Sequence, residues 1–171
     1  MPVNIEIKAS VNNFEEKKRL AEALSDTPCR IIEQEDVFFG SQSGRLKLRL
    51  FSDGTGELIF YERSDQSGAK QSDYLIYPVN NLPVLRALLS RALGVKIVVK
   101  KKRFLYLTGQ TRIHLDVVEG LGNFIELEVV MKPLQDTAEG YAIARELMQK
   151  LQIEESELVA KSYADLLTEK R

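Results

Sequence analysis

RIHLDVVEGLGNFIELEVV, the stretch Arg112–Val130, alternates polar and apolar residues on both sides of a glycine-rich turn. Successive side chains of a β-strand point to opposite faces, so the alternation predicts two strands joined by a turn at residues 119–123. One face is apolar, and the other gathers the carboxylates of Asp116, Glu126 and Glu128. Carboxylates that converge in an enclosed space repel one another unless a cation lies among them. A solvated outer face of an antiparallel sheet has the same pattern, so this hairpin alone leaves both interpretations open.

The same alternation recurs in the strands predicted before the hairpin. In RLKLRLF at residues 45–51, Arg45, Lys47 and Arg49 share one face while three leucines share the other. Asp53 and the glycine after it favour a tight hairpin turn into the next strand. The predicted strands are residues 3–11, 31–39, 45–51, 57–63, 70–77 and 96–107, in addition to the two strands of the hairpin.

Four helices are predicted between and after these strands. Asn13, followed three residues later by Glu16, indicates the start of a helix that ends before Pro28. The other three helices are predicted at residues 82–93, 137–151 and 155–168. Because the strands follow one another in hairpins, the order indicates an α+β fold rather than βαβ units, in a single domain covering residues 1–171.

The composition excludes several classes of partner. The 171 residues are 44% hydrophobic and carry a net charge of −1, and the pI is about 6.0. The chain therefore has no overall basic field for nucleic acid or an anionic membrane, and any anion site must be local. Cys29 is alone, which fits a reducing compartment. The chain start has no leader pattern and no apolar run is long enough to span a membrane, so we expect a cytoplasmic protein.

The charged positions favour a closed barrel over an open sandwich. Charges of both signs occupy alternate positions of nearly every strand, while four helices need apolar surface to cover. A closed barrel with helices packed outside and charges lining its lumen meets both demands. Inside such a lumen, neighbours such as Lys47 and Arg49 would require a polyanion between them. Acidic residues facing basic ones then indicate a divalent metal chelated by a phosphate chain.

Six motifs, in this order and spacing, resemble the CYTH superfamily of triphosphate tunnel metalloenzymes. The resemblance is closest to class IV adenylyl cyclases and extends to thiamine triphosphatase. The motifs are NIEIK at 4–8, GRLKLR at 44–49, YERSD at 61–65, KKKRFLY at 100–106, IHLDVVEGLGNFIELE at 113–128 and SYADLL at 162–167.

The resemblance implies an eight-stranded antiparallel β-barrel, the triphosphate tunnel, that binds a triphosphate together with Mg²⁺ or Mn²⁺. The triphosphate-binding residues it implies are Lys8, Arg45, Lys47, Arg49, Arg63, Lys70, Lys101, Arg103 and Arg112. The implied metal ligands are Glu6, Asp116, Glu126 and Glu128, and the implied catalytic residues are Lys8, Arg63, Glu126 and Glu128. Ser162 and Tyr163 resemble the segment that folds over the tunnel mouth.

Two positions need separate interpretation. The family signature is ExExK, and this chain has Asn4 where the first Glu belongs. Asn can ligate a hard cation through its carbonyl oxygen, but it removes one negative charge and with it support for a second metal. His114 invites a role as general base, but we interpret it as a hydrogen-bonded strand residue.

The function expected from the resemblance is a metal-dependent enzyme that converts ATP to cAMP and pyrophosphate. Two alternatives stay open: a phosphohydrolase of thiamine, nucleoside or inorganic triphosphate, and a non-catalytic nucleotide or polyphosphate binder. The expected partner is a small-molecule triphosphate, with no nucleic acid and no membrane. A homodimer is compatible with the family resemblance.

Overall fold

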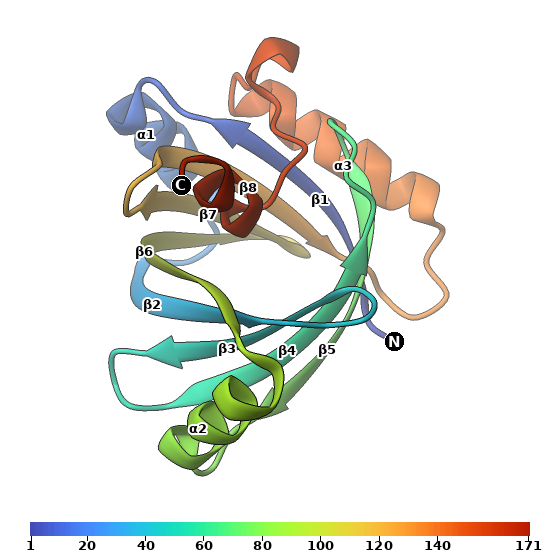
Figure 1. Ribbon diagram of the computed structural model, residues 1–171. Helices are drawn as coiled ribbons and strands as arrows, with labels where there is room; N and C mark the ends of the chain where they lie inside the picture. The colour runs from blue at the N-terminus through green and yellow to red at the C-terminus, as the bar shows by residue number, and fades with distance from the viewer.

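Eight antiparallel strands close into a barrel in the computed structural model, which describes residues 1–171 (Figure 1). Around the barrel the strands follow the order β1-β5-β4-β3-β2-β6-β7-β8, and β8 pairs with β1 to close it. The strands are β1 (Val3–Ser10), β2 (Arg30–Phe39), β3 (Arg45–Phe51), β4 (Gly56–Arg63), β5 (Lys70–Pro78), β6 (Val95–Thr108), β7 (Thr111–Val118) and β8 (Gly122–Val130). The predicted fold class, an α+β closed barrel with helices outside, is confirmed.

The quoted hairpin forms β7 and β8, and its turn depends on glycine. Gly120 and Gly122 have φ angles of 81° and 109°, a backbone region that residues with a Cβ rarely occupy. The turn fixes the register that places His114 opposite Glu126. Because the period of a strand is two, the charged residues of the two strands and His114 all point to the same side of the barrel wall.

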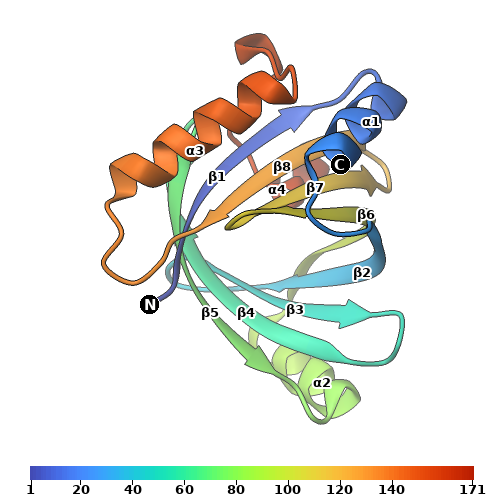
Figure 2. The same cartoon turned by 180° about the vertical axis from the view of Figure 1, so that it is seen from behind.

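The apolar outer face of the barrel is covered by three helices, α1 (Phe14–Leu24), α2 (Leu82–Leu93) and α3 (Thr137–Lys150) (Figures 1 and 2). The α3 helix lies on β1 and β8, α1 lies on β6 and β7, and α2 lies on β2. The main core lies between the barrel wall and the first and third of these helices; Ile113 and Leu127 belong to it and are fully buried. Burial of this outer face leaves the lumen to the polar residues of each strand.

The last predicted helix, residues 155–168, is wrong as a single helix. The chain forms a short 3-10 turn η1 (Glu155–Glu157), then an extended segment, and then α4 (Tyr163–Glu169). The backbone N–H of Val159 donates to the Lys8 carbonyl at 2.9 Å, so the extended segment lies along β1. Backbone bonds to the barrel replace the bonds that a continuous helix would make within itself.

The start of α4 closes one end of the barrel. Tyr163 and Ala164 pack against Phe38, Val99 and Phe124, which point inward from β2, β6 and β8. Ser162 caps the helix by accepting a hydrogen bond from the Asp165 N–H at 3.1 Å. The lumen therefore has a blocked end at Tyr163.

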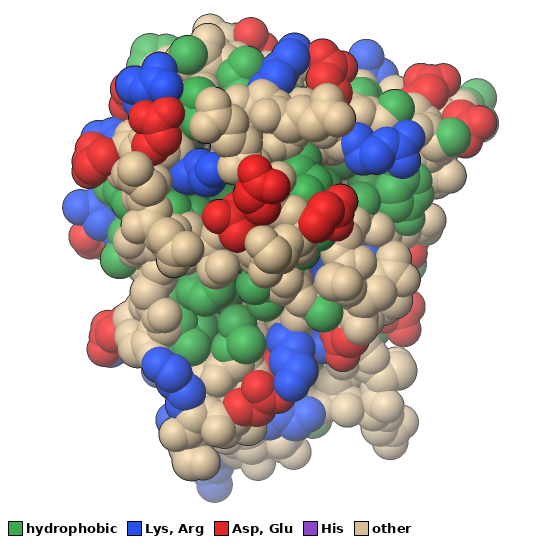
Figure 3. Space-filling view, turned by 90° about the horizontal axis from the view of Figure 1, so that it is seen from above, with side chains coloured by type: hydrophobic (Ala, Val, Ile, Leu, Met, Phe, Trp, Pro, Cys, Tyr) green, Lys and Arg blue, Asp and Glu red, His purple; other side chains and the backbone are tan.

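One face of the molecule shows no concentration of either charge. On the face seen from above, Lys and Arg side chains lie among Asp and Glu side chains (Figure 3). None of the helices combines the length and apolar character needed to cross a bilayer. The concentration of like charges predicted from the sequence must therefore be sought inside the barrel.

Candidate active site

The barrel encloses a cavity of about 270 Å³ that is lined by residues from all eight strands. Ser162 and Tyr163 line its closed end, where both side chains are buried. At the other end, the lining residues include Phe51, Glu57 and Ile76, and Ile76 is 45% exposed. The cavity is therefore a blind tunnel that opens to solvent at one end.

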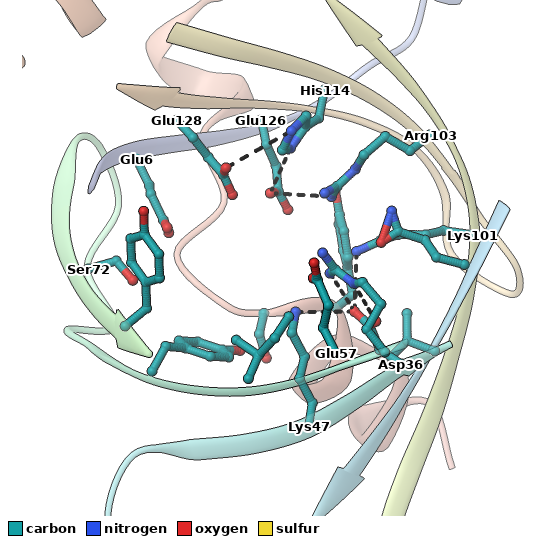
Figure 4. Close-up of a pocket in the computed structure, with 18 of the residues that line it drawn as sticks. Glu6, Asp36, Lys47, Glu57, Ser72, Lys101, Arg103, His114, Glu126 and Glu128 are labelled. Carbon is teal, nitrogen blue, oxygen red and sulfur yellow. Dashed lines mark hydrogen bonds and ion pairs between the residues drawn. The ribbon is translucent and has the colours of Figure 1, made fainter. Parts of the chain in front are cut away.

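Most of the residues predicted to bind triphosphate or metal face this cavity. The predicted residues that line it are Glu6, Lys8, Lys47, Arg49, Arg63, Lys101, Arg103, Arg112, Glu126 and Glu128. Figure 4 shows Glu6, Glu126 and Glu128 on one side of the lumen, with Lys47 and Lys101 facing them across it. We call Glu6, His114, Glu126 and Glu128 the acidic wall, and Asp36, Lys47, Arg49 and Lys101 the basic wall.

Asp36 holds the basic wall together. Its carboxylate accepts two hydrogen bonds from Arg49, both at 2.8 Å, and one from Lys47 at 3.1 Å, while the Lys101 ammonium lies 3.6 Å away. Burial alone would raise the pKa of Asp36, but Arg49 and the two lysines hold it well below its usual range. The prediction that Lys47 and Arg49 can coexist only around a bound polyanion is therefore wrong, because Asp36 supplies a counter-charge from within the chain.

The two lysines of the basic wall have lowered pKa values. Burial, and then the charge of Arg103, lower the pKa of Lys101 to about 7. Burial and the neighbouring Arg49 lower the pKa of Lys47 to about 8. A bound anion would favour the charged form of both lysines.

The acidic wall is held more loosely. The nearest cations stand 3.5 Å from Glu6 (Arg63) and 3.5 Å from Glu126 (Lys8), beyond ordinary hydrogen-bond length. Glu128 has a closer partner, the Arg112 guanidinium at 2.9 Å. Burial, followed by repulsion from Glu128, raises the pKa of Glu6 to about 7. Nearby cations, by contrast, hold the pKa of Glu126 well below its usual range and lower that of Glu128. Glu6 is therefore the one carboxylate of this wall whose charged form is disfavoured near neutral pH.

His114 stands within the acidic wall without a hydrogen bond at Nδ1. This nitrogen is 3.9 Å from Glu126 Oε2, and Nε2 is 4.0 Å from Glu128 Oε2. Burial, and then the charge of Arg103, lower the pKa of His114. His114 is a strand residue of β7, as predicted, but the predicted hydrogen bond is not found at Nδ1.

Three predicted site residues do not line the cavity. Arg45 binds two carboxylates at the closed end, Asp65 and Asp165, each at 2.9 Å. The Lys70 ammonium donates to the carbonyls of Gln66 and Ala160. Both lie near the blocked end and not in the tunnel itself.

Asp116, a predicted metal ligand, is the third of them. Its two oxygens accept hydrogen bonds from Arg103, both at 2.7 Å, and one oxygen also accepts from the Tyr163 hydroxyl at 2.9 Å. The side chain is fully buried behind Arg103. The structure therefore places Asp116 apart from the other predicted metal ligands, as the partner that holds Arg103.

Four buried polar atoms that line the cavity have no hydrogen-bond partner: Asn4 Oδ1, Gln34 Oε1, Arg63 Nε and His114 Nδ1. An unpaired buried polar group typically costs about 1–3 kcal/mol, so a cluster of them in one cavity is typical of a binding site. Gln34 and Asp36 are not among the predicted site residues. They alternate with Phe38 and lie on the opposite face from Val37, and this alternation is the signal in the sequence that could have identified them.

The CYTH domain family model matches residues 3–163 of the chain. The structure is similar to the PH1012 protein of Pyrococcus horikoshii OT3, with 29% identity, a TM-score of 0.85, and coverage of 95% of this chain and 98% of that one. It is also similar to a candidate adenylate cyclase of Vibrio parahaemolyticus, with 18% identity, a TM-score of 0.80, and coverage of 96% and 97%.

A third similar structure is HpAC1 of Hippeastrum, a candidate adenylyl cyclase with a dominant triphosphatase activity. It shares 12% identity with a TM-score of 0.68, and the alignment covers 100% of this chain and 97% of that one. No curated protein matches the chain. The similarities below 25% identity concern the fold.

Proposed function

This chain belongs to the CYTH domain family, and we propose that it is a divalent-metal-dependent enzyme acting on a triphosphate in the barrel lumen, most like a class IV adenylyl cyclase. One observation carries the proposal: basic and acidic side chains face each other in an enclosed tunnel that also contains four unpaired buried polar atoms. Such an arrangement suits a polyanion that touches one wall directly and the other through a cation.

The phosphate chain would lie between the two walls. Lys47, Arg49 and Lys101 would reach it from the basic wall, while Lys8, Arg63 and Arg103 would reach it from β1, β4 and β6. Arg112 stands nearer the open end, and Arg45 and Lys70 would bind only beyond the blocked end. Lysine and arginine bind phosphate oxygens through charge-assisted hydrogen bonds, which are about twice as strong as neutral ones.

The acidic wall fits a divalent cation. Glu6, Glu126 and Glu128 offer the carboxylate oxygens that Mg²⁺ and Mn²⁺ prefer, and a bound cation would favour the charged form of Glu6, whose pKa burial raises to about 7. When bound, the ion supplies positive charge that offsets charge on the phosphate oxygens. Asn4 adds an unpaired carbonyl oxygen but no charge, which supports one ion in preference to two.

The chemistry requires no nucleophilic side chain from the protein. In the cyclase reaction the ribose 3′-hydroxyl attacks the α-phosphorus, the bond to pyrophosphate breaks, and the hydroxyl proton is released. Positioning and charge stabilisation account for most of phosphoryl-transfer catalysis. Lys8 and Arg63 would stabilise charge on the phosphates, and Glu126 and Glu128 would hold the ion.

A triphosphate phosphohydrolase is the second candidate, and the modest size of the tunnel is compatible with it. The cavity, about 270 Å³, lies at the lower edge of the range of roughly 300–1,000 Å³ that holds drug-sized ligands. It suits a phosphate chain with its organic group outside. Water would then attack the terminal phosphorus, and the bond to the remaining diphosphate would break. The fold similarity to HpAC1 is compatible with this outcome.

Product analysis separates these functions. The purified protein is incubated with ATP, thiamine triphosphate or inorganic triphosphate, with Mg²⁺ or Mn²⁺, and products are separated by anion-exchange chromatography. Cyclic AMP with pyrophosphate indicates the cyclase, and orthophosphate indicates the phosphohydrolase. Binding without turnover of any substrate leaves the non-catalytic binder. The homodimer and the cytoplasmic location remain predictions.

A further inference from the structure

His114 is the least explained group in the acidic wall. It is the single histidine of the chain, its side chain is 4% exposed, and it lies on β7 opposite Glu126. A buried imidazole normally binds a backbone carbonyl, a carboxylate or an ordered water. Here Nδ1 has no partner, although two carboxylates stand beside the ring (Figure 4).

The distances suit a shared cation better than direct hydrogen bonds. The ring nitrogens are 3.9 and 4.0 Å from oxygens of Glu126 and Glu128, whereas hydrogen bonds between nitrogen and oxygen measure about 2.7–3.2 Å. One nitrogen and one oxygen from each carboxylate all lie within 4.8 Å of one another. Ligands about 2.0–2.2 Å from one ion are at most about 4.4 Å apart, so a small inward movement would complete such a set.

The two arginines nearest the ring are engaged with carboxylates. Arg103 lies near His114, but its guanidinium is already fixed by Asp116 through two bonds of 2.7 Å. Arg112, on the same strand, is paired with Glu128. Arginine has donors and no acceptor, so neither side chain could accept a hydrogen bond from the imidazole.

Resting on the proposed function for the carboxylates, we infer that His114 is a nitrogen ligand of the cation site and makes it selective for transition-metal ions over Mg²⁺. Carboxylates alone favour Mg²⁺, Ca²⁺ and Mn²⁺. An added imidazole favours ions such as Zn²⁺, Co²⁺ and Fe²⁺, and it favours Mn²⁺ over Mg²⁺ because Mg²⁺ is reluctant to exchange water for nitrogen.

The single histidine permits a direct test. Untagged protein is labelled with nitrogen-15 at histidine, loaded with cadmium-113 as a probe for transition ions, and examined by NMR. We expect the cadmium resonance to split into a doublet in labelled protein and to remain a single line in unlabelled protein. The direct coupling requires a bond between the metal and His114, and a merely structural histidine would not produce it.

His114→Gln supplies the affinity measurement. Calorimetry should show that Cd²⁺ and Zn²⁺ bind at least about tenfold more weakly to the variant, since even loss of a partner of a metal ligand costs about 10–100-fold. Mg²⁺ affinity should change less than about twofold, because Mg²⁺ relies on oxygen ligands. An unchanged thermal unfolding curve shows that the variant folds.

Three results would overturn the inference. An unsplit line from labelled protein with cadmium bound removes His114 from the ligand set and leaves the carboxylate site intact. Equal weakening of Mg²⁺ and Cd²⁺ removes the selectivity. Absence of cadmium binding overturns this inference alone, because the Mg²⁺ titration and the turnover assay with Mg²⁺ or Mn²⁺ test the metal requirement of the proposed function separately.

Discussion

The two walls of the tunnel differ in how closely their buried charges are paired. On the basic wall, Asp36 makes hydrogen bonds of 2.8–3.1 Å to Arg49 and Lys47. On the acidic wall, Glu6 and Glu126 have cations no closer than 3.5 Å. Breaking a tight buried pair is costly, whereas a loose one leaves oxygens free for another cation. The ion pairs of the basic wall are therefore already formed, whereas carboxylate oxygens of the acidic wall are free to bind a cation.

The largest effect should come from removing the built-in counter-charge. Asp36→Asn leaves three buried cations without their carboxylate, and loss of one partner from a buried ion pair costs about 3–5 kcal/mol. Urea unfolding should show this loss, and added inorganic triphosphate should restore part of it by replacing the missing charge. Glu35→Gln is the matched control on the same strand, because Glu35 pairs with Arg86 near the surface. Equal stability of the two variants would contradict the role of Asp36.

On the acidic wall, Glu126→Gln should reduce metal-dependent turnover by at least about 100-fold, the upper effect of losing support around a metal. Glutamine keeps the shape of the side chain but lacks the charge that binds the ion. Steady-state rates with Mn²⁺, together with circular dichroism for the fold, provide the measurement. Glu119→Gln, in the exposed turn between β7 and β8, is the control. An undiminished rate in Glu126→Gln would remove the carboxylate from the mechanism.

Lys47→Ala tests whether the basic wall binds the phosphate chain. It removes a charged donor to phosphate, which typically contributes about 1.5–3 kcal/mol, so triphosphate should bind about 30-fold more weakly. Calorimetric titration with inorganic triphosphate measures the change. Lys100→Ala, at an exposed position beside Lys101 on β6, should leave the dissociation constant unaltered. If Lys47→Ala does the same, Lys47 does not contact the ligand.

The smallest effect concerns pH. The pKa of Lys101 is about 7, and a bound polyanion favours the charged form, so binding raises this pKa and takes up a proton. Above pH 7 that proton comes from solvent, and affinity should fall by up to about tenfold per pH unit. Titrations in buffers of different ionisation enthalpy measure the uptake. Lys101→Arg, which stays charged, should flatten the profile; a wild-type affinity that is constant with pH would refute the proton uptake.

Much of the fold could be predicted because the period of a strand is local. Alternation at residues 45–51 shows which side chains share a face, whatever strand lies beside them. The same parity placed Lys47, Arg49 and Glu126 together in the lumen. Parity does not show which distant strands pair, so the contact of Asp36 on β2 with Lys101 on β6, its hydrogen-bonded neighbour, could not be predicted.

The errors have a common cause in tertiary contacts. The pattern at 155–168 favours a helix, but Lys8 and Lys70 bind backbone carbonyls of Lys161 and Ala160, which holds this segment extended. Asp116 has the inward parity of a metal ligand, yet Arg103 occupies both of its oxygens. Local sequence cannot weigh such competing partners, which lie far apart along the chain.

Closure of the barrel by α4 has a consequence for the order of events. With Tyr163 packed against Phe38 and Phe124, a ligand must enter and leave the tunnel through the same open end. A ligand that enters the tunnel with its phosphates first must leave with its phosphates last. Whichever product lies deepest is the last to escape, and it obstructs the next turnover until it has gone.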